Sequence, residues 1–120
     1  MEIFGGIGIG LAAVLKVGLK VRQYVYVDNS QVSTRVARHH LHQLMVLYPQ
    51  QLYPTAIRGC FLRLLHDVIL INKVDLRHLG QVDMVIAGWP CQGHSRAGAG
   101  RGLEDRMSSV FWNLIWLMQW

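Results

Sequence analysis

Cysteines, prolines and acidic side chains are scarce in this sequence, and these shortages exclude several classes of protein. Only two cysteines occur among 120 residues, Cys60 and Cys91, and they form no Cys-x-x-Cys pair. Neither a zinc site nor a disulfide framework is therefore indicated, and a reducing compartment suits the chain best. With three prolines and 52% hydrophobic residues against 16% charged ones, the composition is that of a globular chain rather than a disordered one.

Long apolar runs are also missing. Lys16 and Lys20 interrupt the first apolar stretch, and the last one, from Val110 to Trp120, is too short to cross a bilayer. The start of the chain does not read as a secretory signal. We therefore expect a soluble chain, or part of a soluble protein, that has no membrane partner.

Negative charge is the third shortage. Seven acidic residues stand against 12 lysines and arginines, which gives a formal net charge of +5. Such an excess suits an acidic partner such as nucleic acid, but it is also common on ordinary solvated surfaces. Charge alone decides nothing here.

What is present is an alternation of short β-like runs with helical runs, and this pattern predicts one α/β domain built on an open parallel sheet. The predicted strands are Glu2–Phe4, Gln23–Val27, Asp67–Ile71 and Val82–Ala87. Helices are predicted over Ile9–Val17, over Gln31–Leu47 behind the cap signal Asp28-Asn29-Ser30, and from Ser108 onward. Residues 49–59 are predicted to be a loop.

Cys91 stands directly after the last predicted strand, in Gly88-Trp89-Pro90-Cys91-Gln92-Gly93. The strand before it reads as buried, and open α/β sheets place their chemistry at such strand ends. A lone cysteine is either a small packed hydrophobe or a nucleophile. Pro90 stiffens the turn and several glycines loosen the arginine-bearing loop that follows, so the sequence favours a reactive site over core packing.

A glycine-rich turn, Phe4–Gly10, joins the first strand to the first helix and could present backbone amides to a ligand. The dinucleotide fingerprint requires glycine or alanine where this chain has Leu11, so a dinucleotide is disfavoured. Asp28 ends the second strand, where a carboxylate can accept hydrogen bonds from ribose hydroxyls. The alternative for Asp28 is a helix N-cap. Asp75 could bind an adenine amino group or could cap the short turn over residues 76–79.

These features occur in the order Phe4-x-Gly6-x-Gly8, Asp28, Asp75 and Pro90-Cys91-Gln92-Gly93-x-Ser95-x-Ala97-Gly98. In this order and spacing the chain resembles the cytosine carbon-5 DNA methyltransferases over nearly its whole length, and Phe4–Leu19 resembles their de novo branch. The resemblance implies a Rossmann-like methyltransferase fold and S-adenosylmethionine as the cofactor. It implies cofactor contacts for Phe4, Gly6, Gly8, Asp28, Asn29, Asp75, Leu76 and Pro90.

The resemblance also implies that Cys91 is the nucleophile that adds to carbon 6 of a cytosine flipped out of double-stranded DNA. It assigns DNA contacts to Gln92, Ser95, Arg96 and Arg101. For each of these four residues an ordinary solvated loop is an equally good interpretation. The expected location is the nucleus in a eukaryote and otherwise the cytoplasm.

The chain departs from the family pattern in two ways. The family follows this loop with Asp-x-Arg-Ser, whereas Asp105-Arg106-Met107-Ser108 has its arginine one position early. The family's Glu-Asn-Val segment, target-recognition region and closing helix would lie beyond residue 120. We therefore expect residues 1–120 to form a partial catalytic domain, with the remainder supplied by a missing C-terminal part or a partner subunit. Alone, it should bind cofactor weakly and methylate DNA at no appreciable rate.

Alternatives remain. The chain could be an inactive remnant that binds cofactor or a partner, or an enzyme that methylates a small molecule. Trp112, Trp116 and Trp120 share a helical face, which is more often a core stripe than a binding surface. His39 and His42 also share a face, but a solvated helix face is a better interpretation of them than a metal site.

Overall fold

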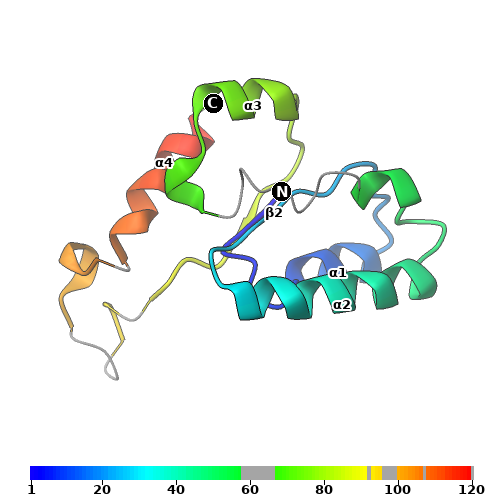
Figure 1. Cartoon of the computed structure of the whole chain (residues 1–120), viewed down its shortest axis with the longest axis horizontal. Coiled ribbons are helices and arrows are strands. Elements are labelled where there is room, and N and C mark those ends of the chain that lie inside the picture. The colour runs from blue at the N-terminus through cyan, green and yellow to red at the C-terminus, as the bar shows by residue number, and fades with distance from the viewer. Residues whose placement is uncertain (58–66, 92, 96–99, 107, 120) are drawn as a thin grey trace.

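The structure is a computed structural model that describes residues 1–57, 67–91, 93–95, 100–106 and 108–119. Strands and helices alternate along it, as the sequence pattern predicts (Figure 1). The strands are β1 (Glu2–Ile3), β2 (Tyr26–Val27) and β3 (Ile86–Ala87), and the α-helices are α1 (Ile9–Lys16), α2 (Gln31–Leu47), α3 (Lys73–Leu79) and α4 (Phe111–Met118). Short 3-10 helices cover Pro54–Ile57, Val68–Leu70, Gly102–Glu104 and Ser108–Val110.

The three strands form one parallel sheet in the order β2-β1-β3. Glu2 of β1 is in register with Tyr26 on one side and with Ile86 on the other. Parallel neighbours require a crossover, which α1 provides between β1 and β2. The expected fold class, an open parallel α/β sheet of the Rossmann-like methyltransferase type in partial form, is confirmed.

Helices cover both faces of this sheet (Figure 1). Successive side chains of a strand point to opposite faces of the sheet. Tyr24 and Tyr26 therefore point toward α1 and α2, whereas Ile3, Val25 and Val27 point toward the opposite face. On the first face the core is completed by apolar side chains of the two helices, namely Leu11, Leu15, Ala37, Leu41 and Leu44. On the second face it is completed by Val68, Ile71, Leu114 and Leu117.

None of the four predicted strands has the expected bounds. Glu2–Phe4 and Gln23–Val27 are strands only over Glu2–Ile3 and Tyr26–Val27. Asp67–Ile71 is not a strand, because Asp67 caps a 3-10 helix over Val68–Leu70 and its side chain accepts a hydrogen bond from the Ile69 amide at 3.1 Å. Only Ile86–Ala87 of the run Val82–Ala87 is a strand. That run was expected to be buried, yet Val82, Met84 and Val85 are 38–46% exposed, since β3 is an edge strand of the described sheet.

The helix predictions fared better. The bounds of α2 are those expected, and α1 ends one residue earlier than expected. The last helix starts at Phe111, after a 3-10 turn over Ser108–Val110. Trp116 packs on the core cluster that contains Ile3, Leu114 and Leu117, while Trp112 is 58% exposed. These two tryptophans therefore do not form one buried stripe. Trp120 lies outside the described residues.

Within the part of the chain that the structure describes, no helix has both the length and the apolar character needed to cross a membrane.

Candidate active site at the carboxyl edge of the sheet

Three chain segments meet at the carboxyl edge of the sheet, one after each strand. The glycine turn follows β1, Asp28 follows β2, and the segment from Gly88 to Cys91 follows β3. Backbone hydrogen bonds hold the first and last of these segments against their neighbours, from the Gly5 amide to the Val27 carbonyl at 3.2 Å and from the Gly88 amide to the Ile3 carbonyl at 3.3 Å. Parallel pairing therefore brings the predicted cofactor segment and the predicted nucleophile to the same edge.

The glycine turn has a backbone that ordinary residues avoid. Phe4, Gly6 and Gly8 have φ values of 55°, 53° and 78°. For Phe4, which has a side chain, this left-handed conformation is strained, and such strain is concentrated at functional sites. A Cβ added at Gly6 would meet nothing within 4 Å, so one side of the turn is open.

Tyr26 supports the turn from beneath. Its hydroxyl donates a 2.6 Å hydrogen bond to the Gly6 carbonyl, and its ring lies so close to Gly5 that a Cβ there would be 2.5 Å from it. The side chain is 1% exposed. Burial raises the pKa of Tyr26 well above its usual range, and the nearby charge of Asp28 acts in the same direction. Tyr26 therefore keeps its proton and remains a donor. Sequence analysis assigned it no role beyond the strand.

The carboxylate of Asp28 binds two backbone amides. Oδ2 accepts from Gly6 at 2.8 Å, and Oδ1 accepts from Ser30 at 2.8 Å. The alternative that Asp28 is the N-cap of α2 is wrong, because that cap is Ser30, whose side chain accepts from the Ser33 amide. Asp28 is partly exposed and ties the end of β2 to the glycine turn. Its neighbour Asn29 is exposed.

The N-terminus of α1 is occupied by Glu2, which sequence analysis missed. This side chain is 4% exposed, and its carboxylate accepts from the Gly10 amide at 3.0 Å, the Leu11 amide at 3.2 Å and the Tyr24 hydroxyl at 2.6 Å. The glycine turn was expected to present backbone amides to a ligand, but the Gly10 and Leu11 amides at this helix end are already bound by a carboxylate of the chain. An acidic residue inside an apolar strand was the available signal.

Asp75 and Leu76 lie in the first turns of α3. The Asp75 carboxylate accepts from the Asn72 amide at 2.9 Å, and Asn72 accepts in return from the Asp75 amide, which makes a capping box. Asp75 therefore takes part in capping, but as the third residue of a helix that starts at Lys73 and has Asn72 as its N-cap, not as the cap of a turn over residues 76–79. Leu76 packs, with Phe4, on the core cluster that contains Ile3, so two predicted cofactor residues share one face of the sheet.

Cys91 is exposed, so the alternative that it is a packed core residue is wrong. Its carbonyl accepts from the amides of His94 at 2.9 Å and Ser95 at 3.0 Å, which makes a tight turn after Pro90. The turn is held from behind at Gly93, which is buried and whose carbonyl accepts from the Gly102 amide at 2.9 Å. A Cβ at Gly93 would lie 2.5 Å from Ser108 Oγ and 2.6 Å from the Gly102 carbonyl oxygen.

Aromatic packing fixes the segment that precedes Cys91. The Trp89 ring lies 4.9 Å from Phe111 of α4 and 6.3 Å from the His94 ring, measured between centroids. Trp89 Nε1 and Ser108 Oγ are buried and have no hydrogen-bond partner. Pro90, the next residue after Trp89, is partly buried. The cysteine thus projects from a turn whose flanks are packed.

The residues predicted to face DNA are described in part. Arg101 is exposed and Ser95 is partly buried. Gln92 and Arg96 lie outside the described residues. Arg106, the arginine that stands one position early, is exposed, and its carbonyl accepts from the Ser109 hydroxyl at 2.8 Å.

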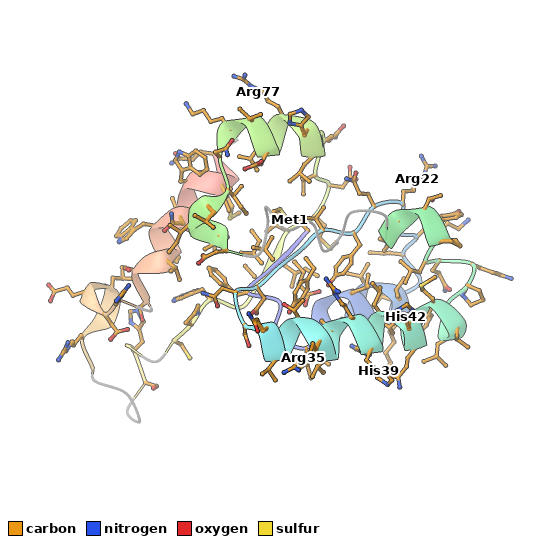
Figure 2. The ribbon with its side chains drawn as sticks, viewed as in Figure 1. Met1, Arg22, Arg35, His39, His42 and Arg77 are labelled. Carbon is orange, nitrogen blue, oxygen red and sulfur yellow. The ribbon has the colours of Figure 1, made fainter. Side chains whose placement is uncertain are left out.

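The histidines of α2 have separate environments. His39 and His42 are exposed, and His39 lies on the side of α2 that faces away from the rest of the molecule (Figure 2). His40 Nδ1 lies 3.1 Å from the Ile7 carbonyl of the glycine turn. Across the described ranges, no three side chains of His, Cys, Asp or Glu come together as a metal site would require.

Comparison with known proteins decides the family. Residues 58–119, slightly more than half of the chain, match the family described as C-5 cytosine-specific DNA methylase. The chain belongs to this family.

Three curated relatives of this chain are methyltransferases. It is 37% identical over 49 residues to the type II methyltransferase M.NgoBI of Neisseria gonorrhoeae, covering 41% of this chain and 16% of that protein. It is 24% identical over 117 residues to the orphan methyltransferase M.SPRI of Bacillus phage SPR, and this match covers 96% of this chain and 22% of that protein. The third, the orphan methyltransferase M.Rho11sI of Bacillus phage rho11s, is 36% identical over 45 residues, which cover 38% of this chain and 9% of that protein. The chain spans less than a quarter of the length of these relatives.

The polar groups at this edge of the sheet fit a nucleoside better than a nucleotide phosphate. The partly exposed Asp28 carboxylate can accept hydroxyl hydrogen bonds, and the open side of Gly6 leaves room for a ligand beside it. The amides of Gly10 and Leu11 that would bind a phosphate are bound by Glu2 instead. An uncharged ribose suits this edge, whereas a pyrophosphate does not.

Proposed function

We propose that this chain carries the cofactor half and the nucleophile of a DNA cytosine carbon-5 methyltransferase. The observation that supports it best is that an exposed cysteine on a packed turn and an open glycine turn end neighbouring parallel strands at one edge of the sheet. Family membership gives this arrangement its chemical meaning.

The proposed cofactor is S-adenosylmethionine. Asp28 and Asn29 would bind the ribose, Phe4 would lie against the adenine, and Gly6 and Gly8 would approach the methionine part. Asp75, Leu76 and Pro90 would complete the adenine side. When bound, the cofactor supplies an electrophilic methyl group.

Cys91 is the proposed nucleophile. Its thiolate adds to carbon 6 of the cytosine, and the electron pair of the 5,6 double bond makes carbon 5 nucleophilic. After carbon 5 has taken the methyl group, it loses its proton, the carbon–sulfur bond breaks and the thiolate returns to Cys91. The tight turn at Cys91 and the buried Gly93 behind it hold the backbone that carries the sulfur.

DNA is the proposed substrate, with the target cytosine flipped out of the duplex at a cost of roughly a few kcal/mol. Gln92, Ser95, Arg96 and Arg101 follow Cys91 closely enough in sequence to contact the strand around that base. The net charge of +5 favours association with the phosphate backbone. In a eukaryote the place of action would be the nucleus, and otherwise the cytoplasm.

The test of the nucleophile is covalent trapping on DNA that contains 5-fluorocytosine, because a fluorine at carbon 5 blocks proton loss and leaves the adduct intact. The chain is joined to the remaining catalytic segments of a C-5 cytosine methyltransferase, as its share of the relatives' length requires. We expect an adduct with the wild-type protein and with Cys60→Ser, the control that removes the other cysteine. Cys91→Ser should give none while binding cofactor normally, and an adduct with Cys91→Ser would refute the assignment.

The 120-residue chain alone tests the cofactor half. We expect it to bind S-adenosylmethionine weakly, to lose this binding in Asp28→Ala, and to transfer no measurable tritiated methyl group to DNA. Appreciable methyl transfer by the chain alone would overturn the proposal that its chemistry needs further segments.

A further inference from the structure

Both backbone polar groups of Gly6, its amide and its carbonyl, are bound by residues of β2 and the loop that follows it. Tyr26 donates its hydroxyl to the Gly6 carbonyl at 2.6 Å, and Asp28 accepts from the Gly6 amide at 2.8 Å. Gly6 is left-handed at φ 53°, a conformation without a helical or sheet hydrogen-bond ladder to hold it. These two side chains therefore determine where the centre of the glycine turn lies.

Tyr26 is built into this position and has no freedom to leave it. Its side chain is 1% exposed, and its ring fills the space that a side chain at residue 5 would need. The tyrosine at position 26 thus requires glycine at position 5. Since burial and the charge of Asp28 raise the Tyr26 pKa, the hydroxyl stays a donor across the physiological pH range.

We propose that Tyr26 is a positioning residue for the nucleoside cofactor. It acts through Gly6 rather than by touching the ligand, and it keeps the glycine turn in the one arrangement in which Asp28 binds both the turn and a ribose. The proposal rests on the proposed function, because it concerns the same site. Preorganisation of this kind strengthens binding, since the turn is already ordered before the ligand arrives.

The contacts of Asp28 explain why the hydrogen bond from Tyr26 to the Gly6 carbonyl matters for the ligand. Both of its carboxylate oxygens already accept backbone amides, from Gly6 and from Ser30. Each carboxylate oxygen can accept more than one hydrogen bond, so a ribose hydroxyl can be added without breaking either contact. Binding of the ribose hydroxyl requires Gly6 to stay in place. The Tyr26 hydroxyl restrains Gly6 at its carbonyl, while Asp28 binds its amide.

The test is Tyr26→Phe, which removes one oxygen and keeps the ring against Gly5. The matched control is Tyr24→Phe. Tyr24 is two residues earlier on the same face of the sheet, is 6% exposed, and donates an equally short 2.6 Å hydrogen bond, but to Glu2 instead of the glycine turn. Both variants should lose similar stability to denaturant. In calorimetry of the 120-residue chain with S-adenosylmethionine, Tyr26→Phe should raise Kd about five- to tenfold, as expected for one lost hydrogen bond, and Tyr24→Phe less than about twofold.

A second measurement needs no ligand. In amide hydrogen exchange followed by NMR, the Gly6 amide should exchange faster in Tyr26→Phe than in the wild-type chain or in Tyr24→Phe. Equal Kd values for the two variants, or unchanged exchange at Gly6, would overturn the positioning role. A wild-type chain that binds no S-adenosylmethionine would instead overturn the proposed function and this inference with it, so the two failures are told apart by the wild-type measurement.

Discussion

Gly93 is the residue on which the geometry around Cys91 depends most closely. A Cβ at this position would lie 2.5–2.6 Å from atoms of Ser108, Asp105 and Gly102, and backbone atoms cannot move aside cheaply. We expect Gly93→Ala to lower the free energy of unfolding by about 1–3 kcal/mol through overpacking. Urea denaturation measures this, with Gly88→Ala as the control because a Cβ there meets nothing within 4 Å. Equal midpoints for the two variants would show that the turn is not held at Gly93.

Individual residues also show where sequence reasoning stopped. The sequence predicted a functional acid after the second strand and a helix cap within Asp28-Asn29-Ser30. It could not tell that Asp28 binds the glycine turn and that Ser30 is the cap of α2. Glu2 was placed in a strand and given no further role, because its hydrogen-bond partners Gly10 and Tyr24 become its neighbours only when the sheet forms. Such contacts depend on strand register, which single residues do not reveal.

At the level of elements, α1 depends on a carboxylate that comes from the neighbouring strand. Glu2 satisfies the Gly10 and Leu11 amides of α1 and lies at the positive end of the helix dipole. We expect Glu2→Gln to lower the free energy of unfolding by about 1–3 kcal/mol, because the amide cannot accept at both positions and carries no charge. Thermal denaturation followed by circular dichroism measures the loss, and the exposed Glu104→Gln is the control. A midpoint unchanged in Glu2→Gln would mean that its charge contributes nothing.

Helices were predicted more accurately than strands for a physical reason. The helix α2 contains its own periodic apolar face and its own cap, so its bounds follow from local sequence. The apolar run Asp67–Ile71 has no such signal. The Asp67 carboxylate accepts a hydrogen bond from the Ile69 amide, which favours the 3-10 helix over Val68–Leu70. The run Val82–Ala87 is paired only where Ile86 and Ala87 reach β1.

For the molecule as a whole, the parallel sheet was the prediction that mattered for the site. Once the order of β-like and helical runs indicated parallel strands, the segments after them had to meet at one edge, and the glycine turn, Asp28 and Cys91 do so. The role of Tyr26 was not predictable in this way. It depends on a hydroxyl reaching across from one strand to the turn after its neighbour, which requires the packed structure.

The stability of the whole chain at alkaline pH should report on Tyr26. Its folded-state pKa is raised, while an unfolded tyrosine ionises near about pH 10. Below that pH Tyr26 is neutral in both states and its contribution to stability is fully present; above it the unfolded chain loses a proton that the folded chain keeps, so stability falls as pH rises. The slope from this one group is up to about 1.4 kcal/mol per pH unit. Guanidinium denaturation from pH 8 to pH 11 should show the wild-type chain losing stability faster than Tyr26→Phe at the alkaline end, since the variant lacks the group. Parallel pH profiles for the two proteins would contradict a buried, neutral hydroxyl beneath the glycine turn.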